Sequence, residues 1–337
     1  MIADRLRDLR LRLRVALKIE HLTIPPYLCA LYSIPDGKNL AAARVIQSVV
    51  MEEMLHMVLV ANVLNAIGGK PDPSSPDFVP GYPTFVPYTR KAFVVHLGPL
   101  SREAIGTFLD VERPDDLRGG PGEEEHPTVY DFYCAIIREL KALCRTANPF
   151  RGDPGRQVTA EYYYGGAGRP IPVTDLRSAL QALDTILHQG EGLPQSIFEE
   201  PVTHRRRPDF ASRRHLAHYF RLNEIRCGRY YAAADTPRSG PTGAPFPLDW
   251  DAVYPMRLDP RTEDHPRGSE VWALSNEFNR CYMQLLRQIS AGFNGEPKRL
   301  LESVNLMYDL KHKAVALMRV PDGRGQTAGP SFEYVRV

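Results

Sequence analysis

A chain of 337 residues is long enough to bury a large hydrophobic core, as one elaborated domain or as two. Its 43% hydrophobic and 24% charged residues are ordinary for a globular protein, and a net charge of +2 excludes the basic excess typical of nucleic-acid-binding proteins. No apolar run approaches the roughly 20 residues of a membrane span, and the five dispersed cysteines suit a reducing compartment. We therefore expect a cytoplasmic protein that binds neither nucleic acid nor membrane.

Residues 3–33 show the apolar period of a long helix, and Glu20 interrupts the apolar face near its middle. Pro25 and Pro26 lie inside this segment. Because proline has no backbone N–H and clashes with the preceding turn, we expect the helix to kink just after Glu20. The alternative is a helix that ends at Thr23 and restarts.

Residues 38–67 predict a second helix whose apolar face contains two polar residues, Glu53 and His56. A carboxylate and an imidazole three residues apart project side by side from a helix, and an inward Glu-x-x-His pair is typical of bundles that hold two metal ions. If the two helices form an antiparallel hairpin, Glu20 lies about thirteen residues before the turn at 33–37 and Glu53 about sixteen after it. At roughly 1.5 Å per residue, the two carboxylates face each other to within about a turn.

A long insertion, residues 70–173, follows this helix pair. It contains an apolar alternation at 93–97 that predicts an edge strand or extended cover, a short helix near 101–110 and a polar loop at 113–125. The helical pattern at 128–146 has its acidic residues off the apolar stripe, so we interpret it as a packing helix. An insertion of this length matches the long crossover that some helical bundles use.

Residues 174–199 predict the third core helix. Leucines recur along one face, and Glu191 continues that stripe between two glycines. We therefore expect Glu191 to be a metal-ligating carboxylate. The alternative is a solvated residue that lies past the end of the helix.

Residues 209–231 predict the fourth core helix, with His218 and Glu224 as candidate ligands. At 100° per residue their side chains point about 120° apart, so a regular helix cannot easily aim both at one centre. A π-bulge would bring them closer. We prefer His218 because it is level with Glu191, and Glu224 is the second choice. The alternative for His218 is a hydrogen-bonded core histidine.

Two further helical stripes within residues 268–320 predict a helical cover over the bundle. We expect residues 1–337 to form a single elaborated domain of the mainly α class. Its core would be a four-helix bundle with a long crossover, extra C-terminal helices and Pro-rich loops.

Carboxylate and imidazole ligands suit iron, with manganese as the alternative, whereas structural zinc sites favour thiolates and the cysteines here form no CxxC pair. Two iron ions that share a bridging carboxylate would leave open positions for dioxygen. We expect Glu20, Glu53 and Tyr27 to be catalytic, with Tyr27 lining the pocket. The predicted metal ligands are Glu20, Glu53, His56, Glu191, His218 and Glu224.

Five blocks of the sequence resemble the ferritin-like domain of the imine dimer synthases, which act on iminophenyl-pyruvate or indole-pyruvate imines in violacein- and rebeccamycin-type pathways. The blocks are Ile19 to Leu28, Glu52 to His56, Gln189 to Gly192, Leu216 to Phe220 and Ala328 to Glu333. The resemblance spans nearly the whole chain and implies a ferritin-like four-helix bundle and a place in specialised metabolism. It also implies haem as an alternative cofactor, because these synthases are described as haem proteins. At Cys227 the chain lacks the histidine that would complete a second Glu-x-x-His with Glu224.

The pattern favours a dinuclear non-haem iron oxidase or oxygenase that acts with dioxygen on a small, amino-acid-derived substrate. The alternatives are a catalase-like protein or ferroxidase, a haem-linked imine dimer synthase component, and a non-enzymatic scaffold. Assembly into a homo-oligomer or with a pathway partner enzyme is a further expectation. The sequence contains no nucleophile elbow, no phosphate-binding loop and no dinucleotide-binding turn.

Overall fold

The structure, a computed structural model, describes residues 2–88, 94–114, 117, 128–193, 195–199 and 216–336. Most of the loop expected at 113–125, and the expected start of the fourth core helix at 209–215, lie outside the described residues. The α-helices are α1 (Ile2–Tyr32), α2 (Leu40–Ala66), α3 (Arg102–Val111), α4 (Val129–Cys144), α5 (Leu176–Glu191), α6 (His218–Cys227), α7 (Glu270–Phe293) and α8 (Lys298–Met318). Single 3-10 turns are η2 (Pro154–Arg156), η3 (Ala160–Tyr162) and η4 (Thr262–Asp264).

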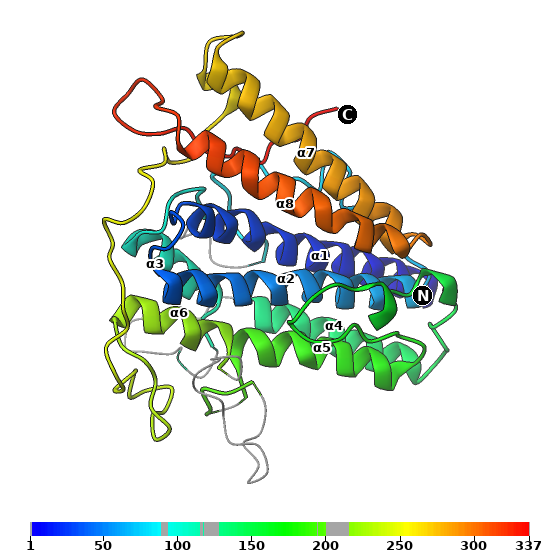
Figure 1. The fold of residues 1–337 in the computed structure, drawn as a ribbon. Helices are drawn as coiled ribbons and strands as arrows, with labels where there is room; N and C mark the ends of the chain where they lie inside the picture. Colours follow the sequence, from blue (N-terminus) through cyan, green and yellow to red (C-terminus); the bar gives the residue numbers. More distant parts are fainter. Residues whose placement is uncertain are drawn as a thin grey trace.

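The helices form three layers with α1 and α2 in the middle (Figure 1). These two helices pack along each other, α7 and α8 cover one side of the pair, and α4, α5 and α6 cover the opposite side, with α3 packed on α6. One hydrophobic cluster contains residues from all eight of these helices, so the layers share a core. The described residues form isolated β-bridges only, and the strand expected at 93–97 contributes one of them, between Thr84 and Val95.

Helix α1 runs without a break through Pro25 and Pro26, so it does not end at Thr23. Because Pro26 has no N–H, the carbonyl of Leu22 loses its helical partner. The buried hydroxyl of Tyr82 donates to that carbonyl at 2.7 Å. A side chain from the insertion therefore satisfies the carbonyl that the proline frees, two residues beyond Glu20.

Tyr82→Phe is expected to destabilise the protein by about 1–3 kcal/mol, the cost of leaving a buried backbone acceptor without its hydrogen bond. Chemical denaturation followed by circular dichroism measures this change. Tyr308→Phe, which alters a tyrosine that is 57% exposed on α8, is the matched control and is expected to change stability by less than about 0.5 kcal/mol. Equal stabilities of Tyr82→Phe and the control would show that this hydrogen bond does not support α1.

The expectation that no segment is long and apolar enough to cross a membrane is wrong for α2. Among the described residues it is the one helix that meets the criteria of length and hydropathy. However, 89% of its most apolar window is buried inside the protein. The apolar character of α2 is therefore accounted for by its central place in the bundle.

The third and fourth core helices differ from their predicted bounds. Helix α5 ends at Glu191 and not near 199, because Gly192 adopts φ 90° and stops the helix. Helix α6 begins at His218 and ends at Cys227, with Ala217 as its N-cap and Gly228 as its C-cap, and the predicted residues 209–215 lie outside the described part of the chain.

The shortened helices place four helix ends close together. Helices α3 and α6 pack on each other towards one end of the central pair, while α4 and α5 pack towards the other end (Figure 1). Consequently α3 and α5 end, and α4 and α6 begin, near the middle of α1 and α2.

Candidate metal centre

Two groups of buried carboxylates and histidines meet at this level. One group is Glu20, Glu53 and His56, and the other is Glu53, Glu112 and His218. Within each group, one potential ligand atom from each residue lies within 4.8 Å of the others. Glu53 belongs to both groups, so the arrangement has the form of two adjacent metal positions with a shared carboxylate.

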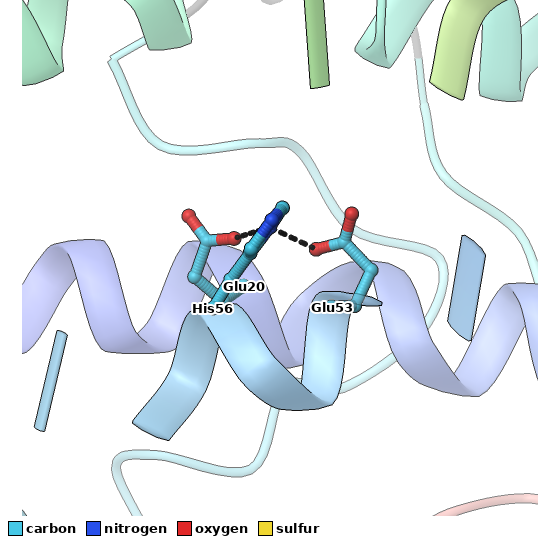
Figure 2. Close-up of side chains that lie close together, drawn as sticks. All are labelled: Glu20, Glu53 and His56. Carbon is cyan, nitrogen blue, oxygen red and sulfur yellow. Dashed lines mark hydrogen bonds and ion pairs between the residues drawn. The ribbon is translucent and has the colours of Figure 1, made fainter. Parts of the chain in front are cut away.

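The first group comes from the central helix pair. Glu20 projects from α1, and Glu53 and His56 project from one face of α2, with His56 between the two carboxylates (Figure 2). His56 Nδ1 lies 3.1 Å from Glu20 Oε2 and 3.7 Å from Glu53 Oε2. All three residues are at most 4% exposed. The facing register and the three-residue spacing produce the predicted convergence.

The second group depends on helix ends. Glu112 is the C-cap of α3 and His218 is the first residue of α6, which packs against α3. His218 Nδ1 lies 3.0 Å from Glu53 Oε1 and 3.3 Å from Glu112 Oε2. Among the described residues this nitrogen has no partner in hydrogen-bond geometry, although the side chain is fully buried. A ring nitrogen aimed between two carboxylates without a hydrogen bond fits a metal ligand.

Tyrosine hydroxyls donate hydrogen bonds to Glu20 and Glu112, the two carboxylates that each belong to one group only and are called terminal below. Tyr27 on α1 donates to Glu112 Oε1 at 2.5 Å, and Tyr133 on α4 donates to Glu20 Oε1. Burial, together with the neighbouring carboxylates, raises the pKa of both tyrosines well above the ordinary value. They therefore stay protonated and act as hydrogen-bond donors.

The electrostatics show a site that attracts cations. Burial raises the pKa of Glu20 to about 7, although the hydrogen bond from His56 opposes this shift. Burial alone would lower the pKa of His56, but hydrogen bonds and charge from Glu20 and Glu53 raise it to about 10. Burial likewise opposes the charging of His218, yet the surrounding carboxylates raise its pKa well above the ordinary value.

The pKa of the shared carboxylate shifts in the opposite direction. Burial would raise the pKa of Glu53, but the neighbouring imidazoles of His218 and His56 outweigh burial and hold the pKa well below the ordinary value. Glu53 is thus ionised in a dry interior, where an unpaired charge is very costly. In the metal-free protein the two imidazolium groups supply the compensating positive charge, and bound metal ions would replace them. The donor set and its burial therefore fit a pair of metal ions.

Metal binding is expected to release about two to three protons per chain at pH 7: one from each histidine, because a ligating imidazole must be neutral at the ligating nitrogen, and part of one from Glu20, whose pKa is about 7. The raised histidine pKa values set the sign: protons compete below these values, so apparent metal affinity rises as the pH rises from about 6 to about 9. Isothermal titration calorimetry in buffers of different ionisation enthalpy counts the protons. Binding without proton release would show that the two histidines are not ligands.

A small cavity of about 50 Å³ adjoins the centre. Glu20, Glu53, His56 and Glu112 form its polar side. Its other side is lined by Ile19, Val111, Val129, Ile186, Leu187 and Gly190. This volume holds a few water molecules or a diatomic molecule, whereas pockets for larger organic ligands measure about 300–1,000 Å³.

The structure brings together four of the six predicted ligands: Glu20, Glu53, His56 and His218. Glu224 does not join them, because α6 is regular and turns its carboxylate away from His218. The Glu224 carboxylate instead accepts the backbone N–H of Tyr231 at 2.7 Å. Glu191 is the last residue of α5, and its side chain lies outside the described part of the structure.

The prediction did not include Glu112, although a signal for it exists. Ile105, Phe108 and Glu112 lie on one helical face, so Glu112 continues an apolar stripe as Glu191 does. Tyr133 lies in a segment interpreted as packing only, and its hydroxyl reaches Glu20. The expected catalytic residue Tyr27 contacts Glu112 and not Glu20 or Glu53 through its hydroxyl.

The chain belongs to the ferritin-like family, since a model of this family matches residues 13–227. The mainly helical, ferritin-like fold expected from the sequence is thereby confirmed. A ferritin-like protein from Caulobacter vibrioides has a similar fold, with a TM-score of 0.61 and 23% identity over 96% of each chain.

A dichlorochromopyrrolate synthase from Lentzea aerocolonigenes is 28% identical over 317 residues. The match covers 85% of this chain but 29% of the synthase, so this chain spans under a third of that relative's length. Together with the family match, it confirms the resemblance to ferritin-like imine dimer synthases. A distant relative of this chain is therefore a biosynthetic enzyme.

Proposed function

We propose that the protein is a dinuclear non-haem iron oxidase or oxygenase. The observation that carries the proposal is Glu53, a buried carboxylate shared by two groups that each add one further carboxylate and one histidine. Such a donor set suits iron, with manganese as the alternative. Membership of the ferritin-like family supports the proposal, because ferritin-like bundles hold metal pairs with inward glutamate and Glu-x-x-His ligands.

When bound, a pair of iron ions supplies the redox chemistry for the reduction of dioxygen. The side chains that would hold these ions are Glu20 with His56 for one position and Glu112 with His218 for the other, and Glu53 belongs to both groups. Tyr27 and Tyr133 fix the orientation of the terminal carboxylates. The apolar residues of the cavity wall would limit the water around a small molecule, such as dioxygen, that this volume can hold.

We further propose that the substrate is a small, amino-acid-derived molecule of specialised metabolism. The support is the similarity to dichlorochromopyrrolate synthase. Assembly with a partner enzyme of the same pathway, or with a second copy of this chain, is part of the proposal.

The proposal is tested by dioxygen uptake. Protein loaded anaerobically with Fe²⁺ is mixed with oxygenated buffer, with and without tryptophan, tyrosine, phenylalanine or their 2-oxo derivatives, and products are analysed by mass spectrometry. The proposal predicts repeated turnover in the presence of at least one amino acid or its 2-oxo derivative, together with an oxidised organic product. Uptake that never exceeds the amount needed to oxidise the bound iron would contradict it.

The small cavity favours a second candidate, a ferroxidase or catalase-like protein whose substrates are ferrous ions or hydrogen peroxide. This candidate predicts oxidation of many Fe²⁺ ions per chain, or peroxide disproportionation by the manganese form, without any organic molecule. A visible spectrum of the purified protein separates both candidates from a haem-linked synthase component, because bound haem gives an intense visible absorption that a non-haem metal pair lacks.

A further inference from the structure

The two histidines of the centre are oriented alike but have different outer partners. Each ring turns Nδ1 towards the shared Glu53 and Nε2 away from it. His56 Nε2 lies 2.9 Å from Gln189 Oε1, a neutral amide oxygen. His218 Nε2 lies 2.8 Å from Glu52 Oε2, a carboxylate oxygen.

Glu52 is itself held by a buried cation. Arg221, which is completely buried, donates through Nη1 to Glu52 Oε1 at 3.2 Å and through Nη2 to Glu52 Oε2. Arg221 Nη1 also donates to Ser48 Oγ at 2.9 Å. A buried ion pair of this kind is not an efficient source of stability, because the two charges must be desolvated. Its place behind a ligand histidine points instead to a role in positioning.

The outer partner of a ligand histidine sets both its orientation and its strength as a donor. A carboxylate that accepts the far N–H makes the imidazole more basic, and loss of such a partner costs about 10–100-fold in metal affinity. A neutral amide acceptor orients the ring but transfers less charge. Arg221 moderates the charge of Glu52, yet the carboxylate is in direct contact with the ring and the guanidinium is not, so the carboxylate dominates.

The other contacts of the two positions are closely matched. Each position has one terminal carboxylate, and each of these accepts one tyrosine hydroxyl: Tyr133 donates to Glu20 and Tyr27 to Glu112. Glu53 is common to both ligand groups, and Thr23 Oγ1 donates to its Oε2 at 3.3 Å. Among the described residues, the difference between Glu52 and Gln189 is therefore the main chemical asymmetry in the outer contacts of the two histidines.

We propose that the two metal positions are inequivalent, and that Glu52, held by Arg221, makes the position at Glu53, Glu112 and His218 the tighter one. This inference rests on the proposed function, because it requires that the centre binds metal. In this view Glu52 and Arg221 are positioning residues. The position at Glu20, Glu53 and His56 fills second and is the more labile.

The test is a titration of metal-free protein with Mn²⁺, followed by calorimetry and electron paramagnetic resonance. In the wild-type protein the first equivalent is expected to bind at least about tenfold more tightly than the second and to give the signal of an isolated ion. The second equivalent is expected to convert this signal into that of a coupled pair. His218→Ala is expected to lose the tight step, whereas His56→Ala is expected to retain it.

Glu52→Gln alone leaves Arg221 buried without its anion and risks unfolding. The variant to compare is therefore Glu52→Gln combined with Arg221→Met, which removes both charges and keeps the side-chain volumes similar. It is expected to weaken the first step by about 10–100-fold and leave the second nearly unchanged. The matched variant Gln189→Glu places an anion behind His56 and is expected to tighten the second step.

Equal affinities for the two ions in the wild-type protein would overturn the inference, as would loss of the tight step in His56→Ala. An unchanged first step in the double variant would also overturn it. A wild-type protein that binds no Mn²⁺ and no Fe²⁺ would instead overturn the proposed function on which the inference rests, so the two failures are distinguishable.

Discussion

Glu53→Ala is expected to remove both metal ions. Glu53 is the one carboxylate common to the two ligand groups, so its loss leaves each position with a single carboxylate and a single histidine. Each of the remaining pairs is too small a ligand set to hold a divalent ion firmly. After anaerobic loading with Fe²⁺ and desalting, elemental analysis is expected to find about two ions per wild-type chain and almost none in the variant.

Glu302→Ala is the matched control for this substitution. Glu302 lies on α8, its side chain is 57% exposed and it pairs only with Arg299 among the described ion pairs. It is expected to keep about two ions per chain. Circular dichroism of both variants establishes that each remains helical. Retention of two ions by a folded Glu53→Ala variant would exclude the ligand set.

Glu112→Ala is expected to leave about one ion per chain, because Glu112 belongs only to the second group. Glu20→Ala is expected to give the complementary half-loaded protein, in which the ion lies beside His218. If the reaction requires a metal pair, both variants are expected to take up dioxygen more than about tenfold more slowly. Loss of an outer partner of a metal ligand already costs about 10–100-fold in activity, and here a ligand itself is lost.

These two variants also test the assignment of Glu112 directly. Elemental analysis reports the number of ions, and the electron paramagnetic resonance of the Mn²⁺ form reports whether a coupled pair remains. A Glu112→Ala protein with two coupled ions would show that another carboxylate, such as Glu191, completes the second position.

The first half of the centre could be predicted because local rules determine it. Glu20 and Glu53 each interrupt an apolar stripe, and a short connection joins their helices, so helical rise alone sets their register. The Glu-x-x-His spacing then places His56 beside Glu53. The structure has this arrangement, with His56 between the two carboxylates (Figure 2).

The second half could not be predicted in the same way, because it depends on where helices stop. The expected long third and fourth helices would present ligands from their middles, whereas α5 stops at Gly192 and α6 starts at His218. This arrangement brings the end of α3, and with it Glu112, next to His218. Glu112 lies in the long insertion, and its approach depends on tertiary packing between α3 and α6 that no local period reveals.

Glu52 and Arg221, which lie behind His218, could not be predicted for a different reason. Glu52 directly precedes the predicted ligand Glu53, and its position predicts an ordinary solvated charge on a helix. Arg221 follows His218 by three residues in a segment rich in polar side chains. Each is unremarkable alone, since charged residues are usually solvated. Only their mutual burial in the fold shows that they form a pair behind His218.

Whether Glu53 is shared by two metal positions is tested by anomalous X-ray scattering at the iron edge from crystals of the Fe²⁺-loaded protein. We expect two peaks about 3.5–4 Å apart, one in contact with Glu20 and His56, the other with Glu112 and His218, and both in contact with Glu53. A folded, loaded protein whose iron lies elsewhere, or in only one of these positions with no contact to Glu53, would contradict it.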